Sequence, residues 1–308
     1  MLLCAGEALI DMLPRKTEGG EAAFAPYPGG SVFNTAVAAA RLGVKTGFFS
    51  GLSTDLFGER LSAVLTAAGV DHRLAARSDR PTTLAFVTLS EGQARYAFYD
   101  ENTAGRMLTE ADLPDLPTDV SAVFFGGISL AVEPCAEAYG ALAALVAPDR
   151  LVMLDPNIRP GFITDEARFR ARMERMLAAA DIVKISDEDL EWLMGEGALA
   201  ERAGKLLEKG PALVLVTEGA EGVTAHGAGD PLRVPAQRVE VVDTVGAGDT
   251  FNAGFLAGLA DAGAMDKASV RAGLSPEVLE AALTLGVRAA AVTVARAGAN
   301  PPRRDELA

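Results

Sequence analysis

The chain has few of the residues that support disulfide, zinc or histidine chemistry. Its 308 residues include two cysteines, Cys4 and Cys135, and two histidines, His72 and His226. Two cysteines in apolar surroundings are too few for a disulfide framework, so we expect a reduced, cytoplasmic protein in which each thiol is a small core hydrophobe. The histidines are far apart and lack the spacing of metal ligands, which argues against zinc chemistry and against a Ser-His-Asp hydrolase.

Positive charge is also scarce. The chain has 28 Lys and Arg against 42 Asp and Glu, a net charge of −14. An acidic surface repels phosphate, which argues against nucleic acid or an acidic membrane as a partner. The apolar run 1–13 has no basic leader and contains Glu7 and Asp11, so we interpret it as a buried first strand rather than a signal peptide or a membrane span.

Short apolar runs alternate with segments of helical length along most of the chain. This alternation is typical of a mostly parallel sheet with helices on both faces, a three-layer αβα core. No repeat or low-complexity linker divides the sequence, so we expect a single α/β domain over residues 1–308. The expected core strands are residues 45–50, 122–125, 151–154, 182–185 and 213–216.

Two helices have readable ends. Ser31 precedes an alanine-rich run that Gly43 closes, which predicts a helix with Ser31 as N-cap. The segment 55–68 is a second helix that ends at Gly69.

Two β-branched and aromatic runs interrupt the alternating pattern. Residues 82–89 and 94–99 are joined by the stretch SEGQ, which predicts a β-hairpin attached to the core. Such a hairpin is either a lid over a site or an extra edge hairpin, and the pattern alone does not choose between them.

The most informative stretch is DTVGAGDTF, residues 243–251, which precedes an apolar segment of helical length. Small residues at a helix start expose backbone N–H groups that have no partner within the helix, and these groups bind anions. Asp249 follows directly. It either complements the helix dipole or accepts a proton from a hydroxyl that attacks a bound phosphoryl group. The loop lacks the third glycine of the dinucleotide motif, and the chain has no P-loop motif.

Three further polar residues are candidates for ligand contacts. Asp11 is expected at the end of the first strand, Asn34 in the first turn of a helix, and Arg159 in the stretch DPNIRP after another strand. Asp and Asn bind sugar hydroxyls, and arginine pairs with phosphate. Each also has an ordinary interpretation, as a turn residue, an exposed helix residue and a solvated surface arginine.

The order of the motifs resembles the ribokinase-like (PfkB) carbohydrate kinase family along nearly the whole chain, and within it the bacterial fructokinases. The stretches that carry the resemblance are GGSVFNTAVAAARLG, SGLSTDLFGERL, RPTTLAFV, RYAFYDENTA, DPNIRP, DIVKISDEDLEWL, VTEGAEG and DTVGAGDTFNAGF. The resemblance implies a ribokinase-like fold with a small β-sheet lid, formed by about 12–28 and 81–100, that excludes water from the transfer.

The same resemblance implies roles for individual residues. Asp249 matches the catalytic base, and Arg159 matches an arginine that holds substrate or the transferring phosphate. Tyr96 and Phe98 alternate onto one face of the lid and would cover the sugar, or else pack within the hairpin. The anion hole matches Gly246, Ala247 and Gly248, and the sugar-hydroxyl contacts match Asp11, Gly30 and Asn34.

ATP and metal ions are the implied cofactors. The family's Asn-x-x-Glu element, which organises Mg²⁺ and the phosphates, is replaced here by Ser186 and Asp189. Asp243 and the carbonyl of Val245 match a monovalent-cation site, yet Pro302 stands where ribokinases have serine, so K⁺ dependence is open. The nucleotide-binding positions implied by the resemblance are Lys184, Asp189, Thr217, Gly219 and Gly222.

The implied activity is ATP-dependent phosphorylation of a sugar, with the 6-hydroxyl of D-fructose as the expected acceptor. One alternative is 2-keto-3-deoxygluconate kinase, whose acidic substrate would use Arg159 or another cation. Another is a sugar- or nucleotide-binding module without turnover. Many relatives dimerise through the lid, so a homodimer is a further expectation.

Overall fold

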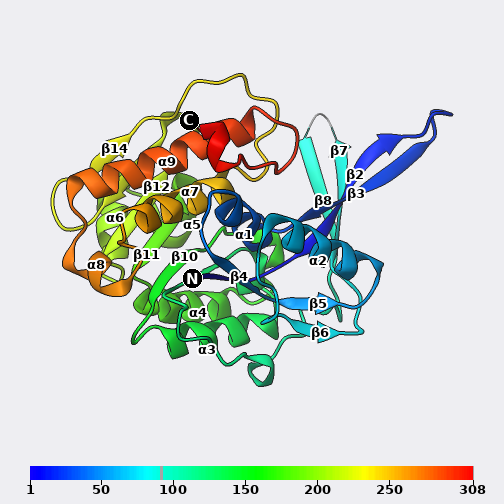
Figure 1. The fold of residues 1–308 in the computed structure, drawn as a ribbon, viewed down its shortest axis with the longest axis horizontal. Coiled ribbons are helices and arrows are strands. Elements are labelled where there is room, and N and C mark those ends of the chain that lie inside the picture. Colours follow the sequence, from blue (N-terminus) through cyan, green and yellow to red (C-terminus); the bar gives the residue numbers. More distant parts are fainter. Residues whose placement is uncertain (91–92, 308) are drawn as a thin grey trace.

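The computed structural model describes the backbone of residues 1–90 and 93–307, and the side chains of these residues outside 88–96. An eight-stranded sheet lies at its centre (Figure 1). Six neighbouring strands, from β12 to β4, are parallel, and β13 and β14 extend the sheet antiparallel. The order is β14 (Leu232–Val234), β13 (Val223–His226), β12 (Leu213–Thr217), β11 (Ile182–Ser186), β10 (Leu151–Asp155), β9 (Ala122–Gly126), β1 (Leu2–Ala5) and β4 (Thr46–Phe49).

Helices cover both faces of this sheet. Because alternate strand residues point to opposite faces, Leu2 and Cys4 pack with α1, α2, α7, α8 and α9, whereas Leu3 and Ala5 pack with α3 to α6. In Figure 1, α7 and α9 lie above the sheet and α3 and α4 lie below it. The three-layer αβα core is therefore confirmed. The helices are α1 (Ser31–Arg41), α2 (Leu56–Ala68), α3 (Cys135–Val146), α4 (Glu166–Ala179), α5 (Asp187–Met194), α6 (Leu199–Leu207), α7 (Ala247–Asp261), α8 (Lys267–Ala272) and α9 (Pro276–Val294).

A second sheet projects from the core, on the right of Figure 1. It contains the expected hairpin of β7 and β8, and β2 pairs parallel with β7 and antiparallel with β3. The turn residues 91–92 lie outside the described part of the chain. The strand order is β3 (Ala22–Gly29), β2 (Leu9–Lys16), β7 (Leu84–Ser90) and β8 (Gln93–Tyr99). A third, two-stranded sheet pairs β5 (Gly51–Ser53) with β6 (Ala76–Ser78).

The second sheet corrects the interpretation of the N-terminal run. Residues 1–13 do not form one buried strand, because the chain leaves the core after β1 and enters the second sheet at Leu9. Asp11 therefore lies within β2, a strand of the second sheet, rather than at the end of the first core strand. A continuous apolar run does not reveal which of two sheets its halves join.

One helix end was also predicted wrongly. The N-cap of α1 is Gly30, with φ 107, and Ser31 is the first helical residue. The ends of α2 are confirmed: the Asp55 side chain accepts hydrogen bonds from the N–H groups of Phe57 and Gly58, and Gly69 adopts the left-handed conformation. Cys4 and Cys135 are both buried and free. Within the described residues, no helix is long and apolar enough to cross a membrane.

Candidate active site

Asp249 lies at the start of α7, in the first turn after the N-cap Gly246. Only 9% of its surface is exposed, and its Oδ2 accepts a hydrogen bond of 2.9 Å from Nδ2 of Asn34 on α1. Burial raises the pKa of Asp249 to about 7; the hydrogen bond from Asn34 opposes this rise and the charge of Asp155 adds to it. A carboxyl group that titrates near neutral pH is suited to accept a proton during catalysis.

The loop before Asp249 forms an open helix N-terminus. Gly246 has φ 78, and a Cβ on it would lie 2.8 Å from Cβ of Ala299, so a larger residue does not fit. A Cβ on Gly248 would lie 3.1 Å from the Nζ atom of Lys184. The unpartnered N–H groups of α7 and the ammonium group therefore face the same small space, which favours an anion.

A buried polar cluster lies beneath this loop. Lys184 Nζ is 3.1 Å from Oδ2 of Asp155, and Nδ2 of Asn252 donates to the same oxygen at 2.7 Å. Oδ1 of Asp155 and Oδ1 of Asn252 are buried without a protein partner. Groups of this kind are rare unless an ion, water or ligand satisfies them.

Asp155 and Asn252 were given no specific role in the sequence analysis. Asp155 is the first residue of the stretch DPNIRP and the last residue of β10. Asn252 follows Asp249 by three residues, and this spacing places both side chains on one face of α7. That spacing was the available signal, but the convergence of Lys184 and Asn252 on Asp155 depends on the order of the strands.

The expected sugar contacts lie around the start of α1 and on β2. Asp11 is half-buried, burial raises its pKa to about 6, and its carboxylate packs so closely on Gly29 that a Cβ there would lie 2.2 Å from Oδ2. Gly30 packs on the backbone of Glu7, where a Cβ on it would lie 2.9 Å from the carbonyl oxygen. Asn34 binds Asp249 directly, whereas neither Asp11 nor Arg159 is hydrogen-bonded to Asp249 among the described residues.

The candidates on the second sheet are only partly described. The Phe98 ring packs edge to face on Phe162 with ring centres 4.4 Å apart, which joins β8 to the 3₁₀ turn after Arg159. The side chain of Tyr96 lies outside the described residues. Arg159 is exposed, and its Nη1 donates to the carbonyl of Ile158 at 3.0 Å.

The proposed nucleotide-binding residues follow the ends of β11 and β12. Thr217 is the last residue of β12. Gly219, with φ 53, begins the 3₁₀ turn that comes next, and Gly222, with φ 103, follows that turn. Asp189 lies in the first turn of α5, where its Oδ2 accepts the N–H of Ile158 at 3.1 Å. Burial raises the pKa of Asp189, and the Ser186 hydroxyl accepts the Asp189 N–H as the N-cap of α5.

The loop of the candidate monovalent-cation site is fixed by hydrogen bonds to the Asp243 carboxylate. Asp243 accepts the N–H of Val245 at 3.0 Å and the N–H of Gly298 at 2.9 Å. In the described part of the chain, no group of three or more His, Cys, Asp or Glu is arranged to hold a metal ion.

A helix N-terminus, a lysine and a buried carboxyl group with a pKa of about 7 meet at the carboxyl edge of a parallel sheet. Together with the fold, this arrangement is typical of α/β enzymes that transfer phosphoryl groups. The family model described as pfkB family carbohydrate kinase matches residues 1–306. The chain belongs to this family.

Curated relatives and solved structures are consistent with this family. The chain is 55% identical over 259 residues to a fructokinase of Rhizobium leguminosarum bv. trifolii, covering 84% of this chain and 79% of the relative. It is similar to the fructokinase of Xylella fastidiosa with bound ATP, with 30% identity, a TM-score of 0.88 and coverage of 99% and 96%. A double mutant of the Vibrio cholerae O395 fructokinase with fructose, ADP and potassium has 25% identity, a TM-score of 0.86 and the same coverage.

Proposed function

We propose that this protein transfers the γ-phosphoryl group of ATP to the 6-hydroxyl of D-fructose, with Asp249 as the general base. The observation that carries the proposal is the position of Asp249: it is buried in the first turn of α7, with its pKa raised to about 7, beside an open anion-binding loop. The fructokinase relatives support fructose as the acceptor.

The hydroxyl of the sugar donates its proton to Asp249 as its oxygen attacks the γ-phosphorus. The bond from this phosphorus to the oxygen that bridges it to the β-phosphate breaks, and ADP leaves. Asn34 orients the carboxylate through its hydrogen bond. The N–H groups at the start of α7 and the Lys184 ammonium group stabilise the negative charge of the transferring phosphoryl group. Asp11 and the backbone at Gly30 bind sugar hydroxyls, and Arg159 pairs with substrate or phosphate.

Mg²⁺ would neutralise charge on the ATP phosphates when bound. Asp155 fits this role because its Oδ1 is buried without a protein partner, and Asp189 is the second carboxylate at this edge. One or two carboxylates are what Mg²⁺ needs when it also binds phosphates. Thr217, Gly219 and Gly222 would contact the nucleotide. The potassium-bound relative supports a monovalent cation near Asp243 and the carbonyl of Val245.

The second sheet would act as the lid of the site. Tyr96 and Phe98 would cover the sugar, and the packing of Phe98 on Phe162 joins the sheet to the 3₁₀ turn after Arg159. Closure excludes water, which would otherwise compete with the sugar as phosphoryl acceptor.

The test is ADP production from ATP and Mg²⁺ with D-fructose, compared with ribose, glucose, adenosine and 2-keto-3-deoxygluconate, with and without K⁺. A clear preference for fructose in kcat/KM is expected, and NMR of the product should place the phosphate on the 6-oxygen. Preference for the keto-acid would contradict the substrate assignment, and absence of ADP with every acceptor would contradict the kinase activity.

A further inference from the structure

Helix α1 lacks the side-chain cap that its sequence predicts. Its N-cap is glycine, and no side chain at the cap accepts a hydrogen bond. The N–H of Ser31 instead donates to Oε1 of Glu7 at 2.8 Å, from a residue 24 positions earlier. Oε2 of Glu7 accepts the N–H of Ser129 at 3.3 Å. The Glu7 carboxylate thus joins the start of α1 to the turn after β9.

The backbone of Glu7 also contacts the start of α1. Its carbonyl accepts the N–H of Phe33 at 3.2 Å, and a Cβ on Gly30 would lie 2.9 Å from this oxygen. On the other side, Gly127 has φ 73, and a Cβ there would lie 2.2 Å from Oε1 of Glu7. Gly30 and Gly127 therefore leave space for Glu7 that a Cβ atom at either position would fill.

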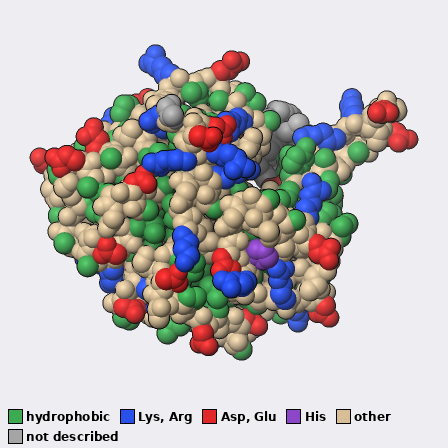
Figure 2. Space-filling model, in the orientation of Figure 1, with side chains coloured by type: hydrophobic (Ala, Val, Ile, Leu, Met, Phe, Trp, Pro, Cys, Tyr) green, Lys and Arg blue, Asp and Glu red, His purple; other side chains and the backbone are tan. Residues whose placement is uncertain are grey.

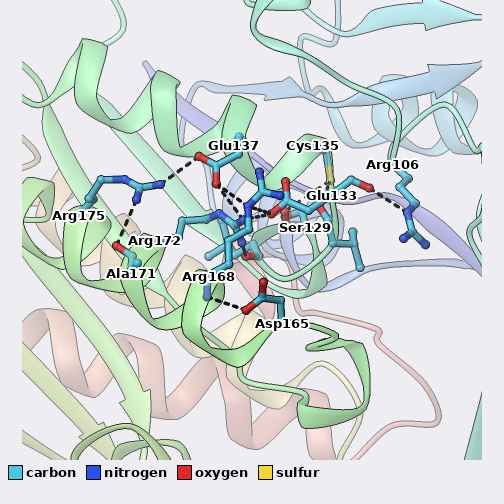
Figure 3. Close-up of polar contacts among 12 residues, drawn as sticks. Arg106, Ser129, Glu133, Cys135, Glu137, Asp165, Arg168, Ala171, Arg172 and Arg175 are labelled. Atoms are coloured by element: carbon cyan, nitrogen blue, oxygen red, sulfur yellow. Dashed lines mark hydrogen bonds and ion pairs between the residues drawn. The ribbon is translucent and has the colours of Figure 1, made fainter.

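The turn that receives Glu7 is itself fixed from outside, as Figure 3 shows. Arg172 is 1% exposed, its Nη1 donates to the carbonyl of Leu130 at 2.8 Å, and it pairs with Glu133 and Glu137. Cys135 Sγ contacts the carbonyl of Ser129 at 3.5 Å. Ser129 is thus held in place independently of Glu7 and gives α1 a fixed reference.

Burying the Glu7 carboxylate carries a large desolvation cost for the fold. Its exposed fraction is 9%, burial raises its pKa, and it forms no ion pair with any residue that the structure describes. Burying a carboxylate without a cation costs free energy, and hydrogen bonds from N–H groups offset only part of that cost. A residue retained for stability alone would be better neutral. The geometry of α1, which presents Asn34 to Asp249, gives the carboxylate a different use.

We propose that Glu7 is a positioning residue for phosphoryl transfer: by fixing the first turn of α1 against Ser129, it sets Asn34 in register with Asp249. This inference rests on the proposed role of Asp249 as base. Glu7 does not touch the reacting atoms. It acts through the helix, since Asn34 lies one turn after Ser31 and its N–H donates to the carbonyl of Gly30 at 2.8 Å.

The test compares E7Q, N34A, the E7Q/N34A double variant and D181N. E7Q is isosteric but places an amide N–H₂ opposite one of the two N–H donors, so it loosens the start of α1. D181N is the matched control: Asp181 is a buried carboxylate that accepts the N–H of Val152 at 2.8 Å and pairs with Lys267 and Arg271. The measurements are Tm, kcat, the KM values for fructose and ATP, and the pH profile of kcat/KM.

E7Q should lower kcat by about 10- to 100-fold, as a misplaced catalytic group does. The KM for ATP should stay near the wild-type value. The acidic limb of the pH profile should move to higher pH, because the Asn34 hydrogen bond lowers the pKa of Asp249 and is weakened. The double variant should be no slower than N34A, since coupled residues act as one unit. D181N should lower Tm and leave kcat and the pH profile unchanged.

Wild-type kcat in E7Q, or a loss in the double variant equal to the product of the single losses, would overturn the inference. If E7Q does not fold, E7D serves instead, since its shorter carboxylate withdraws from both N–H groups. Failure of both to fold would overturn the inference, because a purely structural role would then suffice. Turnover retained in D249N would defeat the proposed base itself, whereas loss in D249N with normal E7Q would defeat only the role of Glu7.

Discussion

At the scale of single residues, the candidate site contains carboxyl groups that are largely removed from solvent. Burial raises the pKa of Asp249 to about 7 and that of Asp11 to about 6. Ionising these carboxyl groups therefore destabilises the fold, and pKa values raised in this way are typical of functional sites.

The first prediction concerns the pH dependence of turnover. Because the base must be unprotonated, kcat/KM for fructose should rise with pH through an apparent pKa near about 7 and then level off. Steady-state assays in overlapping buffers measure it. A profile that is flat from about pH 5 to about pH 9 would contradict the assignment.

The second prediction concerns stability. The folded-state pKa of Asp249 is raised from 3.8 to about 7, so its ionisation destabilises the fold progressively as pH rises through that window. Asp249→Asn cannot ionise. A pKa shift of about three units corresponds to about 4 kcal/mol as an upper limit. At pH values above 7, the Tm of Asp249→Asn should therefore exceed that of the wild type by several degrees. Calorimetry should show this gain shrinking toward about pH 4, the unfolded-state pKa. A gain independent of pH would point to packing rather than charge.

At the scale of secondary-structure elements, the site is the junction of α1 and α7 over the ends of β10 and β11. The start of α7 was predictable from the sequence, because small residues before a helix-length apolar run have few other uses. The α1 cap was not predictable, since its acceptor is Glu7 from another segment rather than Ser31. The convergence of Lys184, Asp155 and Asn252 likewise depends on strand order.

The third prediction concerns the anion-binding loop. Gly248→Ala should raise the KM for ATP and lower kcat, because the new methyl group would lie 3.1 Å from Nζ of Lys184 inside the anion space. Tm should not fall, since alanine favours a helix over glycine by about 1 kcal/mol.

Gly204→Ala in α6 is the matched control, because a Cβ there meets no atom within 4 Å. It should match the wild type in both kinetic parameters. Unchanged kinetics in Gly248→Ala would show that the loop does not bind the phosphates.

At the scale of the whole molecule, the second sheet is the part whose role the core alone does not explain. Figure 2 shows the β2–β3 end of this sheet as an arm that extends away from the body. It exposes apolar rings, with Phe24 42%, Tyr27 43% and Tyr99 63% exposed. The hairpin within it was predictable from alternation. The joining of β2 and β3 to this hairpin was implied only by the family resemblance, which placed about 12–28 in the lid, because the run 1–13 gave no sign of where one sheet ends.

The fourth prediction is that Phe24 and Tyr99, whose rings both pack edge to face on Phe86, join two copies of the chain. Exposed apolar patches mark interaction sites, and symmetric dimers are the commonest soluble oligomers. Light scattering should give twice the mass of one chain for the wild type and the mass of one chain for Phe24→Glu. A monomeric wild type at micromolar concentration would contradict a dimer formed through the lid.

The most direct test of the account is the turnover of Asp249→Asn, measured together with its binding of fructose and ATP by calorimetry. Removing a general base typically costs about 10²- to 10⁴-fold in rate. A loss of this size in kcat is expected, with both ligands still bound at affinities near those of the wild type. Turnover near the wild-type value would show that Asp249 is not the base and that its place at the start of α7 serves only the helix.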